Sequence, residues 1–231
     1  MLCYDFAVSV TRGKFITFEG LDGCGKSTQM NRLAEVLRAE GFEVATAREP
    51  GTTPIGEQVR AILLNSRTQG LAPLAELALM FAARAQLIKE VIEPSLAGGK
   101  FALVDRYTDS SEAYQGGGRE LGSETVLAVH QAICGGLNPD ITVLMDSDPA
   151  ASVARARRRN QRAAENEKDE NRFELENRLF FDRVHEAYLK IAAREPGRIY
   201  MVDARRDGDT VHREIVAEVR KRLGLNAGAA R

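Results

Sequence analysis

Short apolar runs alternate with longer stretches of helical period along almost the whole chain. The apolar runs predict strands at Phe15–Glu19, Glu43–Ala47, Phe101–Asp105, Ile141–Asp146 and Ile199–Asp203. Strands that are apolar throughout are typical of a parallel sheet that helices cover on both faces. The pattern therefore predicts an open, doubly wound α/β fold with a five-stranded parallel sheet. Ligands of such sheets bind beyond the carboxyl ends of the strands.

The first predicted strand is followed by a glycine-rich loop and then by a helical pattern from Gln29 to Glu40. The loop has the P-loop spacing, in which a glycine and four further residues precede Gly-Lys-Ser. Backbone N–H groups of such a loop bind the phosphates of a nucleotide, so we expect the loop to bind ATP. Its residues are Gly20, Leu21, Asp22, Gly23, Cys24, Gly25, Lys26, Ser27 and Thr28.

Two residues of this loop and one acid are expected to act at the phosphates. Lys26 would hold the β- and γ-phosphate oxygens, and the Ser27 hydroxyl would bind Mg²⁺. Asp105 ends the third predicted strand and is expected to be an outer-shell partner of that metal. Arg106 follows it and would meet a phosphate, although a structural ion pair between these two residues is the alternative.

Polar residues also follow the second strand, where Arg48 and Glu49 precede Pro50 and Gly51. They could face the ligand site, or they could belong to a loop before a helix capped by Thr53 with Pro54 in its first turn. A further helix is predicted from Leu74 to about Pro94.

Arg84 lies on the apolar stripe of this helix, three residues after Phe81. An arginine in that position must reach solvent, pair with an acid or meet a ligand. An aromatic ring beside a guanidinium suits a planar base that carries a carbonyl oxygen.

Two further segments have an unusual composition. The three glycines Gly116 to Gly118 follow the third strand and are interpreted as a loop on the substrate side. Arginines gather between Arg155 and Arg162, and the polar, mostly acidic stretch from Ala163 to Asn171 follows. Most of these arginines belong to a solvated helix face, but in a P-loop enzyme such a segment can close over the phosphates. We expect a lid at about residues 153–173.

Bulk composition limits the other possibilities. The chain has 231 residues, a formal net charge of -1 and three cysteines. There is no overall positive charge for nucleic acid, no apolar run long enough to span a membrane, and no even set of cysteines for disulfides. One domain is expected, with a core at about 13–224, terminal extensions at 1–12 and 225–231, and reduced thiols of a cytoplasmic protein.

With these motifs in hand, the chain resembles the bacterial thymidylate kinases over about residues 13 to 224. The resemblance is carried by the P-loop, Arg48-Glu49-Pro50, the Phe81/Arg84 pair, Asp105-Arg106-Tyr107, the run from Tyr114 to Arg119 and the arginine-rich lid. It implies a P-loop nucleoside monophosphate kinase that moves the γ-phosphoryl group of ATP to dTMP with Mg²⁺. It also implies a cytoplasmic homodimer with no nucleic acid or membrane partner.

The resemblance assigns roles to matching positions. Arg48 and Arg106 would hold the acceptor phosphate, while Glu49 and Asp105 would contact metal, water or sugar. Phe81 would stack on thymine and Arg84 would donate to a ring carbonyl. Ser110, Tyr114 and Gln115 would line the base and the deoxyribose. Arg155, Arg159 and Arg172 are the catalytic candidates of the lid.

Two departures from the family bear on these roles. Some members place the stacking phenylalanine four residues before the arginine, and Met80 occupies that position here. The eukaryotic members have an arginine inside the P-loop, whereas this loop has Gly23 and Cys24 and no arginine. Catalytic positive charge is therefore expected from the lid.

Two other functions stay open at the level of sequence. One is a kinase for another nucleoside monophosphate or for a deoxynucleoside, which substrate preference would decide. The other is a nucleotide-dependent switch or binding module. An Asn-Lys-x-Asp motif, which reads guanine, would favour the switch, and the sequence does not contain one.

Overall fold

The structure, a computed structural model, describes residues 12–164 and 170–225. Residues 1–11 and 226–231 of the predicted terminal extensions lie outside this part of the chain. Residues 165–169 of the predicted lid also lie outside it.

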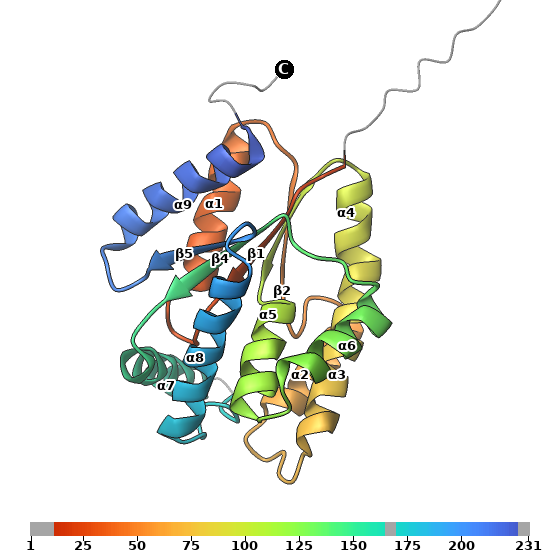
Figure 1. Cartoon of the computed structure of the whole chain (residues 1–231), viewed down its shortest axis with the longest axis vertical. Coiled ribbons are helices and arrows are strands. Elements are labelled where there is room, and N and C mark those ends of the chain that lie inside the picture. Colours follow the sequence, from red (N-terminus) through yellow and green to blue (C-terminus); the bar gives the residue numbers. More distant parts are fainter. Residues whose placement is uncertain (1–11, 165–169, 226–231) are drawn as a thin grey trace, which may run out of the picture.

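A five-stranded sheet forms the centre of the molecule, as predicted (Figure 1). Its strands are β1 (Phe15–Glu19), β2 (Val44–Arg48), β3 (Phe101–Asp105), β4 (Ile141–Asp146) and β5 (Ile199–Asp203). They lie in the order β2-β3-β1-β4-β5, and every neighbouring pair is parallel. The predicted second strand was one residue too early at both ends, because Arg48 still pairs with Asp105 in the ladder.

Helices α1 (Lys26–Ala39) and α9 (Gly208–Leu223) lie side by side on one face of the sheet (Figure 1). Leu33 and Leu37 of α1 pack with Ile215 and Val219 of α9 in one apolar cluster. The same cluster contains Phe18 and other residues of the central strands. Burial of these side chains fixes α1, and with it the P-loop that precedes the helix.

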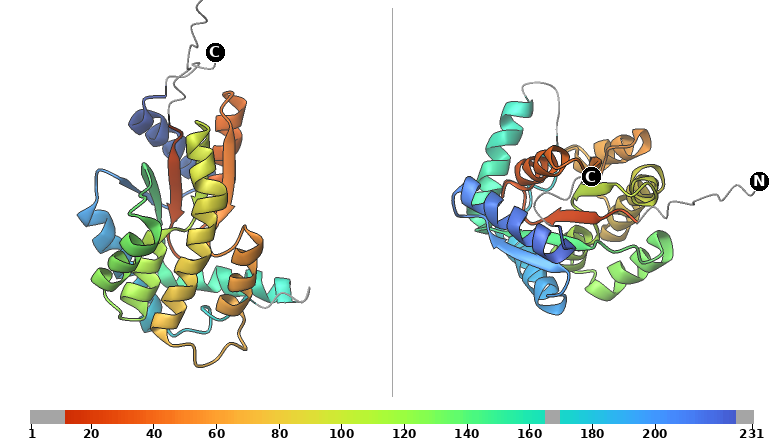
Figure 2. Two further views of the ribbon diagram at one scale, coloured as in Figure 1. Left: turned by 90° about the vertical axis from the view of Figure 1, so that its right-hand side faces the viewer. Right: turned by 90° about the horizontal axis from the view of Figure 1, so that it is seen from above.

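The other face carries one long helical stretch and the shorter helices that follow β3, so that helices lie on both sides of the strands (Figure 2). The long stretch consists of α3 (Pro73–Leu87), the π-helical turn η1 (Ile88–Ile92) and α4 (Glu93–Ala97). It extends past the predicted end at Pro94, since the wider turn before this proline accommodates a residue without an N–H group. Then come α5 (Thr108–Ser111), η2 (Glu112–Gly118) and α6 (Ser123–Cys134).

The glycine run is not the substrate-side loop that we expected. Gly116, Gly117 and Gly118 form the end of η2, and Gly117 and Gly118 pack against α8 (Arg178–Arg194). A Cβ atom on Gly118 would lie 2.6 Å from the Phe180 ring, and one on Gly117 would lie 2.7 Å from the Ala187 Cβ. Something does approach these glycines closely, but it is a helix of the same chain.

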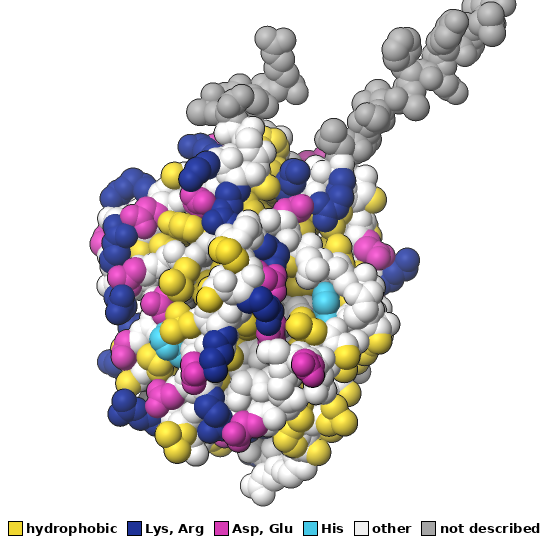
Figure 3. Space-filling model, in the orientation of Figure 1, with side chains coloured by type: hydrophobic (Ala, Val, Ile, Leu, Met, Phe, Trp, Pro, Cys, Tyr) yellow, Lys and Arg dark blue, Asp and Glu magenta, His cyan; other side chains and the backbone are white. Residues whose placement is uncertain are grey.

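The remaining helices are α2 (Pro54–Leu64) and α7 (Pro149–Ala164). The Thr53 side chain accepts from Gly56 N at the start of α2, so the predicted cap is confirmed. In the described part of the chain, no helix is both long and apolar enough to cross a membrane. The face drawn in Figure 3 mixes basic and acidic side chains.

This topology leaves a crevice at the carboxyl ends of β1 and β3. The helix after β1 packs on one face of the sheet and the helices after β3 pack on the other. The two connections therefore separate as they leave the strands, which is the point where open α/β sheets bind ligands.

Candidate active site

The loop after β1 has the backbone geometry that a phosphate-binding loop requires. Gly20, Gly23 and Gly25 have φ angles of 130°, 81° and 100°, a region that favours glycine. A Cβ atom on Gly23 would lie 2.4 Å from the backbone oxygen of Ser152. Lys26 opens α1, and its Nζ donates to Leu21 O at 2.7 Å.

A cleft of about 1360 Å³ lies in front of this loop. Of the nine P-loop residues predicted to bind ATP, Gly20, Leu21 and Cys24 do not line the cleft. Leu21 and Cys24 are buried in the core instead. Most charged side chains in its wall are basic, which suits a chain of phosphates. The basic residues of this wall are Lys26, Arg48, Arg60, Arg106, Arg155 and Arg159.

Ser27 and Asp105 meet across the crevice between β1 and β3. The Ser27 hydroxyl donates to Oδ2 of Asp105, and both residues line the cleft. A hydroxyl and a carboxylate are hard oxygen ligands of the kind that Mg²⁺ prefers, usually together with phosphate oxygens. The residues present therefore fit the predicted magnesium site.

Asp22 and Arg106 form an ion pair, with 2.9 Å between Oδ1 and Nη2. Burial would raise the pKa of Asp22, but the positive charges of Arg106 and Lys26 outweigh it and hold this pKa well below its usual range. Arg106 has a φ of 72°, which is uncommon for a residue other than glycine. Such strained residues cluster at functional sites.

A second cavity of about 630 Å³ adjoins the cleft, and Asp22, Glu49 and Arg106 belong to both. The predicted base and sugar residues Ser110, Tyr114 and Gln115 come together in its wall. The Tyr114 ring lies beneath Arg106, whose guanidinium carbon is 4.9 Å from the ring centre. The Ser110 hydroxyl accepts from Nη1 of Arg106 at 2.8 Å.

Arg84 reaches this cavity from α3 and pairs there with an acid, Glu49. Its Nε donates to Oε2 of Glu49 at 2.7 Å, and its Nη2 donates to the Ser111 hydroxyl. Burial raises the pKa of Glu49 to about 7, although the charge of Arg84 acts in the opposite direction. Both residues line the cavity, so Glu49 faces the site and is not merely part of a loop.

Three buried polar atoms in this wall have no hydrogen-bond partner among the described residues. They are Nη1 of Arg84, which can only donate, Oε1 of Gln115, which can only accept, and Oε1 of Glu49. Buried polar groups are almost always paired. Arg84 Nη1 and Gln115 Oε1 therefore indicate a ligand that offers one acceptor and one donor.

The structure does not bring Phe81 into the cavity wall, which contradicts the stacking role predicted for it. Phe81 is fully buried in the core between α3 and the sheet, and the Arg84 guanidinium carbon lies 4.4 Å from its ring centre. Met80 lines the cavity in its place. Adjacent helical residues point in directions about 100° apart, so only one of the two can face the ligand.

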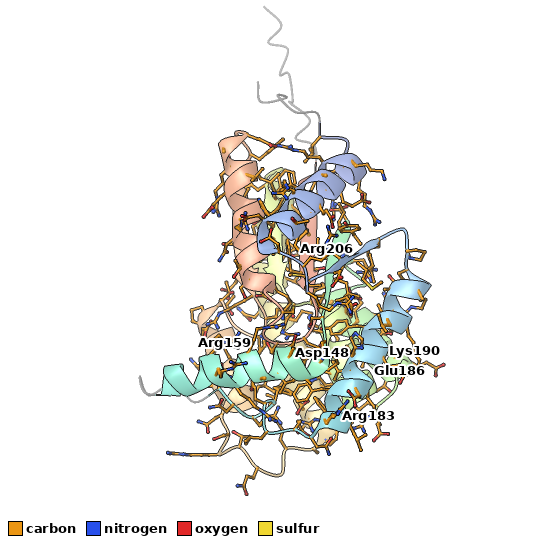
Figure 4. The ribbon with its side chains drawn as sticks, turned by 90° about the vertical axis from the view of Figure 1, so that its left-hand side faces the viewer. Asp148, Arg159, Arg183, Glu186, Lys190 and Arg206 are labelled. Carbon is orange, nitrogen blue, oxygen red and sulfur yellow. The ribbon has the colours of Figure 1, made fainter. Side chains whose placement is uncertain are left out.

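The predicted lid arginines separate into two groups. Arg155 and Arg159 lie on α7, which crosses the lower half of Figure 4, and both line the phosphate cleft. Arg155 donates to Gly23 O at 2.8 Å. Arg172 lines neither cavity, which does not fit the role predicted for it. Its Nη2 lies 2.8 Å from the buried carboxylate of Glu76, and its backbone N donates to Leu64 O.

Several residues of the site were not singled out from the sequence. Arg60 lines both cavities and donates to Pro50 O and to Glu170. Glu174 lines the smaller cavity, where burial and the nearby charge of Asp22 raise its pKa to about 7. Glu76 lines neither cavity but contacts Gln115 of the site. A usable sequence signal existed for it, because Glu76, Met80 and Arg84 recur every four residues and so share one face of α3.

The P-loop cleft and the second cavity adjoin, and Arg106 lines both of them. This arrangement defines a P-loop phosphotransferase that holds a nucleotide donor and a separate acceptor. A family model described as thymidylate kinase matches residues 18–215 of this sequence. The chain belongs to the thymidylate kinase family.

Individual relatives agree with the family model. A thymidylate kinase from Solidesulfovibrio magneticus is 46% identical over 209 residues, which are 90% of this chain and 100% of the relative. One from Trichlorobacter lovleyi is 45% identical over 190 residues, covering 82% and 89%. The crystal structure of thymidylate kinase from Ehrlichia chaffeensis superposes with a TM-score of 0.72 at 31% identity, covering 90% of this chain and 99% of that one.

Proposed function

We propose that this chain transfers the γ-phosphoryl group of ATP to dTMP and so produces dTDP and ADP. ATP lies along the P-loop with its phosphates in the larger cleft, and dTMP occupies the smaller cavity. The acceptor phosphate lies where the two cavities meet, beside Arg106. The observation that carries this assignment is that Nη1 of Arg84 and Oε1 of Gln115, both in the wall of the smaller cavity, are buried and unpartnered.

Thymine matches these two atoms. Its O4 carbonyl accepts from Nη1 of Arg84, and its ring N3–H donates to Oε1 of Gln115. Met80 and Tyr114 provide apolar surface for the ring. Cytosine has an amino group and a bare ring nitrogen at these positions, so it would place a donor against a donor and an acceptor against an acceptor.

The reaction needs positioning and charge neutralisation more than covalent chemistry from the protein. An oxygen of the dTMP phosphate forms a bond to the γ-phosphorus, and the bond from that phosphorus to the β–γ bridging oxygen breaks. The attacking oxygen is already anionic, so no general base is needed. Lys26, Arg106, Arg155 and Arg159 neutralise the charge. Arg48 lines the cleft and pairs with Glu57 at 2.9 Å, and it would exchange this partner for the acceptor phosphate.

Ser27 and Asp105 are the residues that would hold Mg²⁺ in this cleft. The ion would neutralise charge on the β- and γ-phosphate oxygens of ATP. The Ser27–Asp105 hydrogen bond keeps both oxygen donors turned toward the crevice.

A coupled assay of ADP release tests the proposal. Mg-ATP is supplied with each of dTMP, dUMP, dCMP, dGMP and AMP in turn, and a deoxynucleoside serves as a further acceptor. We expect dTMP to give the highest kcat/KM. A higher kcat/KM with another monophosphate would contradict the base assignment, and turnover that needs no acceptor would contradict the kinase.

We also propose a homodimer that acts in the cytoplasm, where ATP and deoxynucleotides are available. The helices α2, α3 and α6 expose large apolar side chains, namely Ile55, Ile62, Leu74, Leu127 and Ile133. Helix α3 packs against both α2 and α6, so these residues lie on neighbouring elements. Light scattering after size exclusion should give twice the chain mass of 25.4 kDa, and a monomer mass would contradict the dimer.

A further inference from the structure

Glu76 lies outside both cavities, at the centre of a polar cluster that reaches the wall of the smaller cavity through Gln115. Its side chain is fully buried in α3. Its Oε1 accepts from Nε2 of Gln115 at 2.9 Å, and its Oε2 lies 2.8 Å from Nη2 of Arg172. Arg119 completes the cluster, with its Nη2 3.2 Å from Oε2 and its Nε donating to both oxygens at 3.3 Å. The four residues come from α3, η2, the residue that follows η2 and the segment after α7.

This cluster fixes which end of the Gln115 amide faces the substrate. A carboxylate only accepts hydrogen bonds, so the NH₂ group of Gln115 must point to Glu76. The carbonyl Oε1 of Gln115 is then left facing the smaller cavity, where it is buried and has no partner among the described residues. If the amide were reversed, two acceptors would face each other at Glu76.

We propose that Glu76 is a positioning residue that determines base selectivity by holding Gln115 as a hydrogen-bond acceptor. The inference rests on the proposed function and adds the residue that selects the base. A base with a ring N–H, as in thymine or uracil, satisfies the exposed Oε1. Cytosine presents the lone pair of its ring nitrogen to this Oε1, so that two acceptors are buried together without a donor.

The substitution Glu76→Gln turns this into a directional test. Arg172 and Arg119 both place an Nη2 donor at the Oε2 position, at 2.8 and 3.2 Å. The new side chain therefore keeps its oxygen at that position and turns its NH₂ group toward Gln115. Gln115 then accepts from residue 76, and its own NH₂ group faces the cavity. A bare ring nitrogen becomes the better partner there.

The measured quantity is the ratio of kcat/KM for dTMP to kcat/KM for dCMP. We expect Glu76→Gln to lower this ratio by about 10²-fold or more, with KM for dCMP falling in absolute terms. A purely structural role would lower both activities and could not improve dCMP. Arg84 is unchanged in both proteins, so its contribution to the ratio cancels.

Arg119→Met is the matched control, because it removes a donor to Glu76 and leaves the Glu76 carboxylate in place to accept from Gln115. We expect it to lower stability and to leave the dTMP/dCMP ratio within about threefold of wild type. Glu76→Gln combined with Arg119→Met removes one negative and one positive charge together. This charge-balanced variant serves as the test if the single variant does not fold, since Arg172 still orients residue 76.

The outcomes separate the two proposals. If the wild-type protein does not prefer dTMP, the proposed function fails before any variant is compared. If the wild type prefers dTMP and the ratio in Glu76→Gln and in the double variant equals that of wild type, the proposed function stands and the role of Glu76 is wrong.

Discussion

The Nε atom of Arg84 lies 2.7 Å from Oε2 of Glu49, and only 2% and 4% of these two side chains are exposed. One carboxylate oxygen is therefore committed to the arginine, whereas Oε1 has no hydrogen-bond partner among the described residues. Arg84 in turn keeps Nη1 free at the cavity wall. The pair thus fixes the guanidinium within the fold and leaves one donor for a ligand.

Replacing Arg84 should separate its two roles. We expect Arg84→Ala to raise KM for dTMP by at least about tenfold, because a buried donor to the base is lost. KM for ATP should change little, since Arg84 does not line the phosphate cleft. Steady-state kinetics with each substrate varied in turn measures both values, and an equal rise in both would contradict a base-specific role.

Met80 and Phe81 should respond in opposite ways. Phe81→Leu leaves a void in the core and should lower the free energy of unfolding by about 1–3 kcal/mol while KM for dTMP stays near wild type. Met80→Ala removes apolar surface from the cavity, so KM for dTMP should rise by about tenfold with a smaller loss of stability. Denaturant unfolding and dTMP kinetics on both variants provide the test. A larger rise in KM for Phe81→Leu would return the stacking role to Phe81.

The sheet and the P-loop could be predicted because their signals are local. A strand buried on both faces shows as a continuous apolar run, and β1, β3, β4 and β5 have the predicted bounds. The position of Arg84 on an apolar stripe also correctly required a partner or a ligand. Its partner Glu49 is 35 residues away, so the sequence could predict that Arg84 has a partner but could not identify that partner as Glu49.

The rest of the site depends on packing between distant segments. The hydrophobic pattern does not tell Met80 from Phe81, because the sheet and not the helix decides which of them is covered. Only the four-residue spacing of some family members pointed to Met80. The glycine run signalled a close approach, but whether a substrate or α8 approaches follows only from the arrangement of the helices. Arg172 looked like another lid arginine until the fold placed the acid Glu76 beside it.

Lys26 should be needed for turnover and not for folding. Lys26→Ala removes the ammonium group at the P-loop, and we expect kcat to fall by about 10²-fold or more. Its only direct hydrogen bond to backbone among the described residues is to Leu21 O, so the melting temperature should change little. Arg32→Ala on the same helix is the control, because Arg32 pairs with Asp209 and does not line the cleft. Turnover close to wild type in Lys26→Ala would contradict the P-loop assignment.

Arg159 and Arg158 are neighbours on α7 and form a matched pair. Both are exposed, but Arg159 lines both cavities, whereas Arg158 lines neither. We expect Arg159→Ala to lower kcat by about 10²-fold, because positive charge is lost where charge develops in the transition state. Arg158→Ala should retain nearly full activity. Equal effects of the two substitutions would mean that α7 contributes only general positive charge, and Arg159 would lose its assigned role.

Glu49 should make the stability of the ligand-free protein depend on pH in a defined direction. Its pKa is about 7 in the folded protein, against an ordinary value of 4.5. Between these values the folded state binds a proton that the unfolded state has released, so the contribution of Glu49 to stability falls as pH rises through this window.

Glu49→Gln cannot titrate and should lose this contribution to the slope of stability against pH. The stability of Glu49→Gln relative to wild type should therefore rise by about 2 kcal/mol from pH 5 to pH 8. The unpaired Arg84 in the variant adds a penalty that does not vary with pH, so the change with pH is the quantity to measure. Glu19 and Glu174, whose pKa values are also raised to about 7, remain in both proteins and cancel in the comparison. Urea unfolding of both proteins at five pH values measures how their stability difference changes with pH. Two stability curves that stay parallel would show that Glu49 is ionised throughout.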